Sequence, residues 1–509
     1  MKIAFRVDAS SKIGTGHLMR CLTLADELKQ RGADSCFVSR HMPKYLRDML
    51  AAKEHGFKLL NSSQNATIAG DLAHAEWLGT TQEADAQDAI HALSHQSWDW
   101  LVVDHYALDA CWESALRQTA GRILVIDDIA DRQHDCDALL DQNFYADMNT
   151  RYAGKVPDQC QLLLGPRYAL LREEFRLLHE QVRPRKGLAQ RILIFFGGVD
   201  APNYTGLAIQ ALIDIGALDI HVDVVIGAQH PCLESIEATC IRHSFTLHVQ
   251  TSRMAELMAA ADLSIGAGGS ATWERCCLGL PTLAICTADN QQKQIADAAQ
   301  EGLLYSPEIH SDTNQTIHRH TRALIENSYL RLLISRTSMQ AVDGRGVSRV
   351  IRKLSYTGVG GMEDIDVRLA VADDAIIAWP WRNNEATRRY FFDPTLVSLE
   401  THLAWWNRSL ADPQRALLLG RLGGRGVGVI RYDFVDPQRA VVSIYLDPEM
   451  TGLGLGSPLL RAGQVWLLQN HPEVNTVLAE VMPENNASLH VFLAAGFQEQ
   501  HKILVWKGC

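Results

Sequence analysis

Three features are missing from this sequence of 509 residues, and each absence excludes a class of protein. No apolar run reaches the roughly 18 residues that a membrane-spanning helix needs, so no membrane span is expected. The N-terminal run MKIAFRVDAS lacks the apolar stretch and cleavage site of a secretory signal. None of the 11 cysteines has C-x-x-C spacing. A cytoplasmic protein with reduced thiols is therefore predicted.

Positive charge is also scarce. The 48 Lys and Arg residues stand against 59 Asp and Glu residues, a net charge of −11. Nucleic-acid binding as the main function is disfavoured, because it usually requires a basic face. The composition, 47% hydrophobic and 21% charged, is that of an ordered globular protein. At roughly 150 residues per domain, the length predicts about three domains.

Short apolar runs alternate with amphipathic segments through the first third of the chain. WDWLVVDHY and GRILVIDDIA are examples of buried strands that end in acidic residues. After a basic, proline-containing stretch at 181–191, the rhythm restarts with ILIFFGGVD, HVDVVIG and DLSIGAGGS. This pattern predicts an α/β fold of two doubly wound, Rossmann-like domains, 1–185 and 186–354, with a ligand cleft between them.

The chain changes character after a glycine-rich segment at 355–364. Lysine is absent from 364 to 501, arginine is frequent, and tryptophan is concentrated here. The apolar runs predict a mixed α/β domain over 365–509.

The first candidate site is the run RVDASSKIGTGH at the end of the first predicted strand. Gly14 and Gly16 permit a tight turn and close backbone approach to a ligand. His17 then falls at the start of a helix, where a neutral imidazole can act as general base for water or a hydroxyl. From this motif alone, a capping or packing histidine in an ordinary loop is an equal alternative.

The longer run RVDASSKIGTGHLMRCLTLA resembles the opening of the UDP-sugar hydrolases of pseudaminic acid biosynthesis. Those enzymes are similar in fold to the two-domain, GT-B glycosyltransferases of peptidoglycan lipid assembly. The resemblance covers nearly all of 1–350. It continues through Val103–Tyr106, Ile126–Ala130, Asp141–Phe144 and Gly165–Phe175.

The resemblance implies hydrolysis of UDP-2,4-diacetamido-2,4,6-trideoxy-β-L-altropyranose to UDP and the free sugar, with inversion. His17 would activate the water, and Asp8 would orient substrate or support His17. Because a diphosphate is a good leaving group, neither a carboxylate pair nor a metal is expected. The expected substrate-binding residues are Arg6, Gly14, Gly16, Asp104, Tyr106, Asn143, Tyr168 and Asn290.

Two glycine-rich loops predict a UDP site in the second domain. In 196–200 and 265–274, glycines follow a strand and allow backbone N–H groups to face phosphate. In the resembling glycosyltransferases a glutamate binds the ribose hydroxyls. Tight packing between helix and strand is the alternative explanation of each loop. The expected UDP-binding residues are Gly197, Gly198, Gly268, Gly269, Ser270, Thr272 and Glu274.

Acidic residues, histidines and a cysteine also gather between 104 and 137, but their spacing matches no metal motif. Carboxylates at strand ends that line a sugar site, or that cap helices, are the favoured interpretation. The residues concerned are Asp104, His105, Asp127, Asp128, His134, Asp135, Cys136 and Asp137.

In the third domain, the strand SIYLD runs through a glycine-rich turn into a helix, and Val481–Phe497 resembles the closing motif of GNAT-type N-acetyltransferases. The resemblance implies acetyl-CoA as cosubstrate, with its pantetheine arm between two strands. Thr451 replaces the usual arginine or glutamine, and Phe492 replaces a frequent tyrosine acid. The expected acetyl-CoA residues are Leu446, Leu453, Gly454, Leu455, Gly456 and Asn486.

The front of this domain, from Trp381 to Trp406, resembles the nucleotide-sugar 4-amine acetyltransferases of the same pathway. Arginines with interleaved aromatics suit a diphosphate ligand, and an amphipathic helix with a tryptophan core face is the alternative. Glu400 and His402 are both candidate bases.

The two resemblances together predict consecutive steps. The acetyltransferase would acetylate the 4-amine of UDP-4-amino-4,6-dideoxy-β-L-AltNAc, and the hydrolase would remove UDP from the product. One alternative is a glycosyltransferase that passes the sugar from a UDP donor to an acceptor alcohol. Another is a C-terminal module that binds CoA without catalysis. The sequence leaves the sugar epimer and the oligomeric state open.

Overall fold

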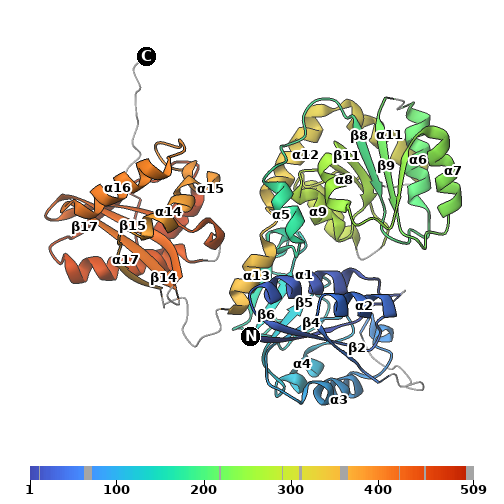
Figure 1. The fold of residues 1–509 in the computed structure, drawn as a ribbon, viewed down its shortest axis with the longest axis horizontal. Coiled ribbons are helices and arrows are strands. Elements are labelled where there is room, and N and C mark those ends of the chain that lie inside the picture. Colours follow the sequence, from blue (N-terminus) through green and yellow to red (C-terminus); the bar gives the residue numbers. More distant parts are fainter. Residues whose placement is uncertain are drawn as a thin grey trace. The chain divides into compact units, whose positions relative to one another are not determined.

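The structure is a computed structural model, and it divides the chain into two compact units, Met1–Leu354 and Ser355–Cys509 (Figure 1). Each unit is described here by itself. The described residues are 1–10, 12–61, 72–216, 219–288, 291–308, 312–355, 365–422, 425–451 and 454–499.

The first lobe of the N-terminal unit is built on a seven-stranded sheet in the order β3-β2-β1-β4-β5-β6-β7. Every neighbouring pair is parallel. The strands are β1 (Lys2–Val7), β2 (Asp34–Ser39), β3 (Gly56–Leu59), β4 (Trp98–Asp104), β5 (Ala120–Ile126), β6 (Ala138–Asp141) and β7 (Gln161–Leu164).

Helices cover both faces of this sheet, as its apolar strands require. Along β1, Ile3 and Phe5 join the core beneath α1, whereas Ala4 joins the core on the opposite face. The helical elements are α1 (Gly16–Gln30), α2 (Lys44–Ala52), η1 (Ala75–Trp77), α3 (Gln82–Leu93), α4 (Ala110–Leu116) and η2 (Pro166–Tyr168).

The second lobe repeats the plan with a five-stranded parallel sheet in the order β10-β9-β8-β11-β12. Its strands are β8 (Arg191–Phe195), β9 (His221–Ile226), β10 (Thr246–Val249), β11 (Leu263–Ala267) and β12 (Thr282–Ile285). Its helices are α5 (Glu173–His179), α6 (Tyr204–Ile215), α7 (Leu233–His243), α8 (Met254–Ala260), α9 (Ala271–Cys277), α10 (Gln292–Gln300), α11 (Thr313–Glu326) and α12 (Ser328–Ala341).

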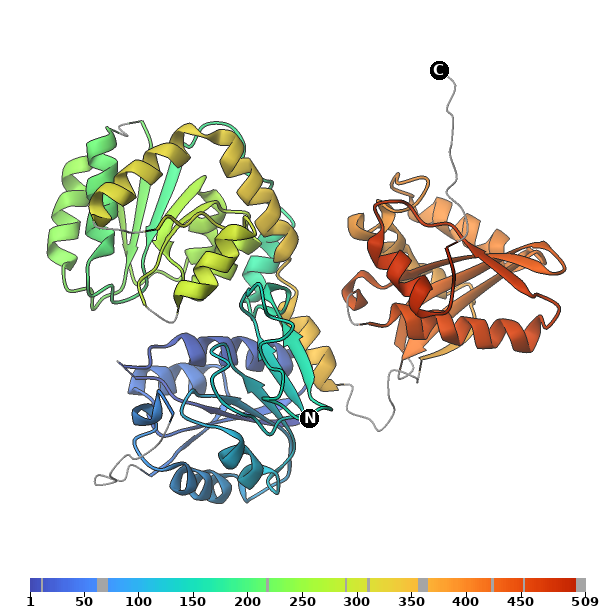
Figure 2. The ribbon, with the colours of Figure 1, turned by 180° about the vertical axis from the view of Figure 1, so that it is seen from behind.

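The last helix of the unit, α13 (Gly346–Ser355), returns to the first lobe. Its side chains Val347, Val350, Ile351 and Leu354 are buried in the same core as Ile3. Figure 2 shows this helix beside the strands of the first sheet. The first lobe is therefore built from two parts of the chain that are far apart in sequence.

The C-terminal unit contains a five-stranded sheet in the order β13-β14-β15-β16-β17, antiparallel except for the parallel pair β16 and β17. Its strands are β13 (Ile365–Leu369), β14 (Arg415–Leu422), β15 (Arg425–Asp436), β16 (Arg439–Leu446) and β17 (Thr476–Ala479). Its helical elements are α14 (Asp374–Asn383), α15 (Glu385–Arg388), α16 (Leu399–Ala411), η4 (Pro448–Met450), α17 (Gly456–Asn470) and α18 (Asn486–Ala494).

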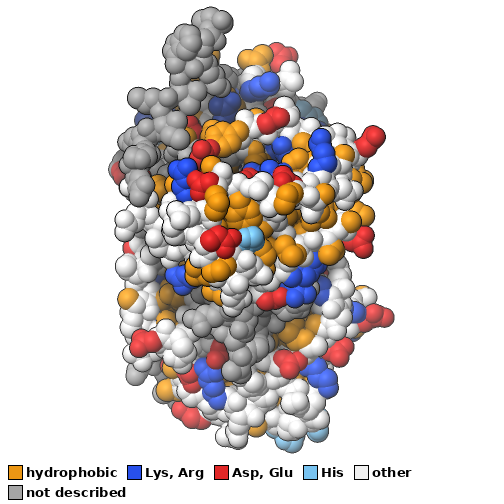
Figure 3. All heavy atoms as spheres, turned by 90° about the vertical axis from the view of Figure 1, so that its left-hand side faces the viewer, with side chains coloured by type: hydrophobic (Ala, Val, Ile, Leu, Met, Phe, Trp, Pro, Cys, Tyr) orange, Lys and Arg blue, Asp and Glu red, His pale blue; other side chains and the backbone are white. Residues whose placement is uncertain are grey.

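The fold predicted from the sequence, two Rossmann-like parallel sheets followed by a mixed α/β domain, is confirmed. All ten cysteines in the described residues are free. No helix among those residues is long and apolar enough to cross a membrane. Figure 3 shows hydrophobic side chains gathered on one face of the C-terminal unit. The exposed ones in this unit include Val465 and Leu468 on α17 and Leu478 on β17.

Candidate active sites

A histidine–carboxylate pair lies at the carboxyl edge of the first sheet. The Nδ1 atom of His17, on the first turn of α1, is 2.5 Å from Oδ1 of Asp104, the last residue of β4. Strands β1 and β4 are neighbours, which brings the loop after β1 next to Asp104. A carboxylate at Nδ1 favours the tautomer whose lone pair is on Nε2, the form that accepts a proton.

Arg20 holds this carboxylate in place, one turn of α1 beyond His17. Its Nε and Nη2 donate to Asp104 over 2.6 and 2.7 Å, and its Nη1 donates to Asp128 over 2.9 Å. Burial opposes ionisation of Asp104, but the charges of Arg20 and His17 outweigh it and hold its pKa well below the usual range. Asp104 is therefore a permanent anion behind His17.

Aromatic rings surround His17. The Tyr106 ring meets the imidazole edge-on at 4.7 Å between centroids, and its hydroxyl donates to Asp128. Trp77 stacks on Tyr106 at 5.6 Å, and His74 lies 5.4 Å from Tyr106. The sequence gives no indication of Trp77 or His74 here, because η1 carries no motif that links it to this edge of the sheet. Such rings can pack against the apolar face of a sugar.

The predicted partner of His17, Asp8, lies deeper in the molecule. Asp8 is fully buried and accepts hydrogen bonds from Arg6 over 2.7 Å and from Ser39 over 2.7 Å. Burial raises its pKa, but Arg6 and His105 outweigh that effect and lower it well below its ordinary value. The carboxylate that contacts His17 is Asp104, and Asp8 with Arg6 forms a buried ion pair under the site.

The other residues predicted to bind substrate lie in different environments. Gly14 has a φ of 79° and closes a turn onto the carbonyl of Ser10, which explains the glycine, and Gly16 begins α1. Tyr168 packs in the core that contains α13 and is 8% exposed. Asn143 is buried between the two lobes. Asn290 lies outside the described residues.

Other acidic residues of the predicted cluster have structural partners. Asp135 and Asp137 both pair with Arg117.

Two buried groups near this cluster have raised pKa values. Burial and the neighbouring charge of Asp128 raise the pKa of Asp141 to about 8. Burial lowers the pKa of His134, but the carboxylate of Asp127 at 3.8 Å and the hydrogen bond with Glu113 outweigh that effect and raise it to about 9. Within the described ranges, no three His, Cys, Asp or Glu side chains are arranged to hold a metal ion.

Glycines at and after the end of β11 lie in close contact with neighbouring elements of the second lobe. A Cβ on Gly266 would lie 2.2 Å from the carbonyl oxygen of Phe195, and one on Gly268 would lie 2.2 Å from Cδ1 of Ile295. Gly197 has a φ of 102°, and added Cβ atoms on Gly197 and Gly198 would meet nothing within 4 Å. These glycines combine close packing on one side with accessible backbone on the other.

The polar residues of the second loop lie around the start of α9. Ser270 precedes the helix and its side chain makes no capping hydrogen bond there. Thr272 is buried, and its hydroxyl lies 3.4 Å from Nη2 of Arg275. Glu274 is buried enough that its pKa is raised, and the guanidinium of Arg172 lies 3.7 Å from its carboxylate.

A buried arginine lies directly beneath this loop. Arg275 is 1% exposed, and its Nη2 donates to the carbonyl of Ala267. Its Nε and Nη1 atoms have no hydrogen-bond partner among the described residues. Burial lowers its pKa to about 10, so it remains a cation at neutral pH. The charge of Glu274 acts on it, and its unpartnered N–H groups favour an anion at the loop above it.

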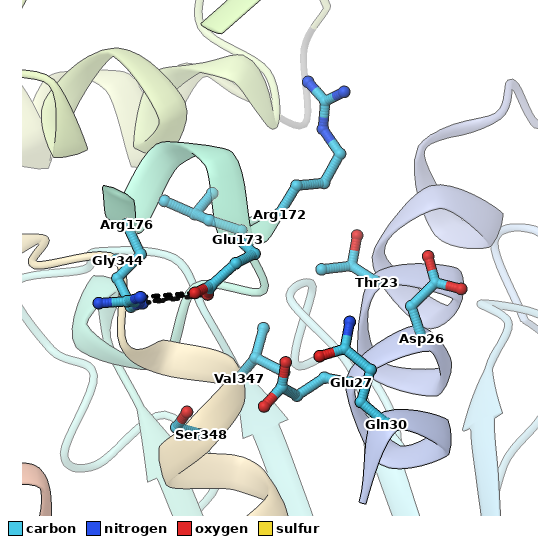
Figure 4. A pocket seen from close by; sticks show the side chains of 11 residues that line it. Thr23, Asp26, Glu27, Gln30, Arg172, Glu173, Arg176, Gly344, Val347 and Ser348 are labelled. Atoms are coloured by element: carbon cyan, nitrogen blue, oxygen red, sulfur yellow. Dashed lines mark hydrogen bonds and ion pairs between the residues drawn. The ribbon is translucent and has the colours of Figure 1, made fainter. Parts of the chain in front are cut away.

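A small cavity of about 110 Å³ lies where α1, α5 and α13 meet, away from His17 (Figure 4). Its lining mixes acidic and basic side chains, and Arg176 pairs with Glu173 one turn away on α5, at one side of the cavity. The guanidinium of Arg172 points out of the cavity toward the second lobe, where Glu274 lies. The cavity is too small for a nucleotide sugar.

The pairing of β16 with β17 covers only part of β16. It runs from Arg439 to Val442, whereas β16 continues to Leu446 and β17 ends at Ala479. The last four residues of β16 therefore have no partner in β17, and the acetyl-CoA site expected there stays a prediction. Gly454 has a φ of 73°, Leu455 precedes α17, and a Cβ on Gly456 would lie 2.7 Å from Val491. Asn486 begins α18 and is exposed, and Leu453 lies outside the described residues.

The arginines at the front of this unit hold its own backbone. Arg382 donates to the carbonyls of Thr395 and Asp393 over 3.0 and 3.1 Å, and Arg388 donates to that of Pro394 over 2.8 Å. His402 is 3% exposed, packs against Trp405 and Trp406, and has a pKa lowered by burial. Glu400 is exposed.

Both units of the chain are similar to known proteins. Residues 376–497 match the model of the acetyltransferase (GNAT) family. The chain is 26% identical over 304 residues to the UDP-2,4-diacetamido-2,4,6-trideoxy-beta-L-altropyranose hydrolase of Campylobacter jejuni, which covers 59% of this chain and 97% of that protein. It is 22% identical over 354 residues to the spore coat polysaccharide biosynthesis protein SpsG of Bacillus subtilis, covering 69% and 96%.

A third relative matches both units together. An uncharacterised protein of Methanocaldococcus jannaschii is 21% identical over 518 residues, which covers 99% of this chain and 98% of that protein. The resemblance predicted from the motifs, to a UDP-sugar hydrolase followed by a GNAT acetyltransferase domain, is confirmed. The chain thus joins a part related to a nucleotide-sugar enzyme to an acetyltransferase domain.

Proposed function

We propose that the N-terminal unit hydrolyses a UDP-linked diacetamido sugar to UDP and the free sugar, and that the C-terminal unit acetylates the 4-amino precursor of that sugar. The observation that carries the first half is the contact of 2.5 Å between His17 and Asp104 at the ligand-binding edge of a doubly wound sheet. The similarity to the Campylobacter jejuni hydrolase supports the choice of substrate.

His17 is the proposed base of the hydrolysis. Its Nε2 accepts a proton from water as the water oxygen bonds to the anomeric carbon from the face opposite UDP. The anomeric C–O bond breaks, and its electron pair leaves with UDP. Asp104 stabilises the imidazolium that forms, and Arg20 keeps Asp104 oriented. The developing oxocarbenium character of the sugar needs no protonated carboxyl on the leaving side, because the diphosphate is already a good leaving group.

UDP is proposed to lie on the second lobe. Open space beside Gly197 and Gly198 supports a phosphate there, Gly268 and Gly269 are the proposed donors of the second loop, and the buried charge of Arg275 favours an anion. Ser270 and Thr272 are the proposed hydroxyl donors. Glu274 binds the ribose hydroxyls in this proposal, which requires that its contact with Arg172 opens.

For the C-terminal unit, the match to the acetyltransferase family supports acetyl-CoA as the cosubstrate. In this proposal the pantetheine arm lies beside the end of β16, beyond its pairing with β17. The acetyl carbonyl carbon bonds to the 4-amine nitrogen as the C–S bond breaks, and the amine loses one proton. Phe492 is buried against Phe497 and cannot protonate the thiolate of CoA, so the proton comes from another group or from water.

The test is a coupled assay on the full chain with UDP-4-amino-4,6-dideoxy-β-L-AltNAc, with and without acetyl-CoA. We expect acetyl-CoA to be consumed first, and UDP and free diacetamido sugar to follow. His17→Ala should still acetylate but release UDP at least about a hundredfold more slowly.

Other results would contradict the proposal. UDP release that needs an added acceptor alcohol would identify a glycosyltransferase. UDP release at the wild-type rate from His17→Ala would remove His17 from the chemistry. CoA binding without turnover on any 4-amino sugar would identify a C-terminal module that binds CoA without catalysis.

A further inference from the structure

A single asparagine connects the two lobes at the candidate hydrolase site. Asn143 follows β6 in the first lobe and is 7% exposed. Its Oδ1 accepts from Nε1 of Trp273 over 2.8 Å and from Nε2 of Gln294 over 3.2 Å, both in the second lobe. Its Nδ2 donates to Oδ2 of Asp128 over 3.2 Å, in the first lobe.

The chemistry of the partners determines which way the amide of Asn143 points. The indole N–H of Trp273 only donates, so it requires the carbonyl oxygen of the amide. The ionised carboxylate of Asp128 only accepts, so it requires the NH₂ group. The side chain at 143 must therefore accept on one side and donate on the other, and only asparagine offers both at this length.

From Asp128 the contacts continue to His17. Arg20 donates from Nη1 to the same Oδ2 of Asp128 over 2.9 Å, and from Nε and Nη2 to both oxygens of Asp104. Asp104 in turn contacts His17. An unbroken series of hydrogen bonds thus joins Trp273 in the second lobe to the proposed base in the first.

The second-lobe end of this hydrogen-bond series, at Trp273, lies beside the proposed nucleotide loop. Trp273 is fully buried and belongs to the helix that follows Gly268, Gly269 and Ser270. Gln294 is on α10, and Ile295 beside it packs against Gly268. Both donors to Asn143 therefore lie on helices that contact this loop.

Neighbouring contacts hold the same segment against α10. The backbone N–H of Ala146 donates to Asp297 over 2.9 Å, and Lys293 pairs with Asp147 at 3.1 Å. Residues 143–147 therefore contact the second lobe, although they connect β6 and β7 of the first. Asn143 is the member of this segment whose side chain reaches back to the carboxylates behind His17.

We propose that Asn143 is a positioning residue, which transmits the occupancy of the second-lobe nucleotide loop to the Asp128–Arg20–Asp104–His17 series and so aligns His17 when UDP-sugar is bound. This inference rests on the proposed hydrolysis. It assigns to Asn143 a role in coupling the lobes in place of the direct substrate contact expected from the sequence.

Two conservative variants test it in the full chain. Asn143→Asp keeps an acceptor for Trp273 but removes the donor and places a second carboxylate beside Asp128. Trp273→Phe removes the indole N–H together with part of the buried ring. The matched control is Trp98→Phe, another buried tryptophan of the N-terminal unit, whose Nε1 donates to the carbonyl of Leu93 over 3.1 Å at the opposite end of β4.

UDP release is measured over a range of substrate concentrations. We expect kcat to fall at least about tenfold in Asn143→Asp and about threefold or more in Trp273→Phe, and KM to change less than kcat. Trp98→Phe should stay within about twofold of wild type. Loss that appears only in KM, or equal loss in all three variants, would overturn the inference, because it would indicate weakened binding or general destabilisation.

A second readout does not depend on turnover. In protein labelled with ¹⁵N-histidine, the ring signals of His17, assigned by their absence in His17→Ala, should shift when UDP is added. In Asn143→Asp, UDP should bind with a Kd within about threefold of wild type, while the His17 shift becomes much smaller.

The outcomes separate the two proposals. Equal His17 shifts in wild type and Asn143→Asp would overturn the coupling and leave the hydrolysis standing. Wild-type protein that neither binds UDP nor releases it from the nucleotide sugar would overturn the proposed hydrolysis, and the coupling with it.

Discussion

At the scale of single residues, the arrangement around His17 resembles a relay with one permanent anion. The imidazole contacts Asp104, and Arg20 contacts both Asp104 and Asp128. The charge of Arg20 keeps both carboxylates compatible in a buried space, where two unpaired anions would be costly. When His17 takes a proton, the imidazolium has an ionised partner in Asp104.

The substitution Asp104→Asn tests this relay. It preserves shape but removes the anion that stabilises the imidazolium, so kcat for UDP release should fall about a hundredfold or more, with a smaller change in KM. Steady-state assays of UDP release measure both constants. Asp135→Asn, which disturbs an ion pair with Arg117 in the same lobe, is the control. Similar losses in the two variants would contradict the relay.

At the scale of elements, the loops of the second lobe are shaped by contacts between strand ends. β8 and β11 approach so closely that a Cβ on Gly266 would lie 2.2 Å from the carbonyl oxygen of Phe195 and 2.5 Å from Nη1 of Arg275. Neither the backbone carbonyl nor the buried guanidinium has room to move. Packing between the two strands therefore requires glycine at 266. The missing side chain also leaves room for the guanidinium of Arg275 under the nucleotide loop.

Gly266→Ala should accordingly destabilise the N-terminal unit by about 2 to 3 kcal/mol, the usual cost of overpacking a buried site. Gly269→Ala is the matched control in the same loop, because a Cβ there would meet only Nε2 of Gln291, at an ordinary 3.5 Å. It should change stability by less than about 1 kcal/mol. Denaturant unfolding measures both, and equal effects would contradict this account of the loop.

At the scale of the whole molecule, the N-terminal unit is closed by its own last helix. α13 leaves the second lobe and buries Val347, Val350, Ile351 and Leu354 in the core of the first. The carbonyl of Leu354 also accepts from Nε1 of Trp100 over 3.0 Å. The chain thus passes between the two lobes twice, once before α5 and once at α13. These two connections limit how far the lobes can separate when ligand enters or leaves.

A pair of truncations tests that closure. A chain that ends at 355 should fold and keep the hydrolytic activity, because it contains the whole compact unit. A chain that ends at 345 loses four buried apolar side chains, at about 1.5 kcal/mol or more each, and should unfold at a distinctly lower temperature. Thermal unfolding and UDP release measure the two effects. Equal stability of the two chains would show that α13 is not needed for the fold.

Much of this architecture follows from local patterns in the sequence. Apolar runs that end in acidic residues, such as WLVVD in β4, determine buried parallel strands and place carboxylates at the ligand edge. GTGH places His17 on the first turn of a helix, and the turn before α17 requires a residue with positive φ at Gly454. These features depend on neighbours in sequence, so the sequence alone predicts them.

The partnerships across the fold depended on the tertiary structure. Asp8 follows β1 and Asp104 ends β4, and the register of these strands decides that Asp104 makes the contact and Asp8 pairs with Arg6. No local pattern joins Asn143 to Trp273, or α13 to the first sheet. The sequence by itself determined which elements form and which chemical groups they carry. The packing of distant segments decided which of those groups meet, because long-range burial and pairing depend on the whole fold.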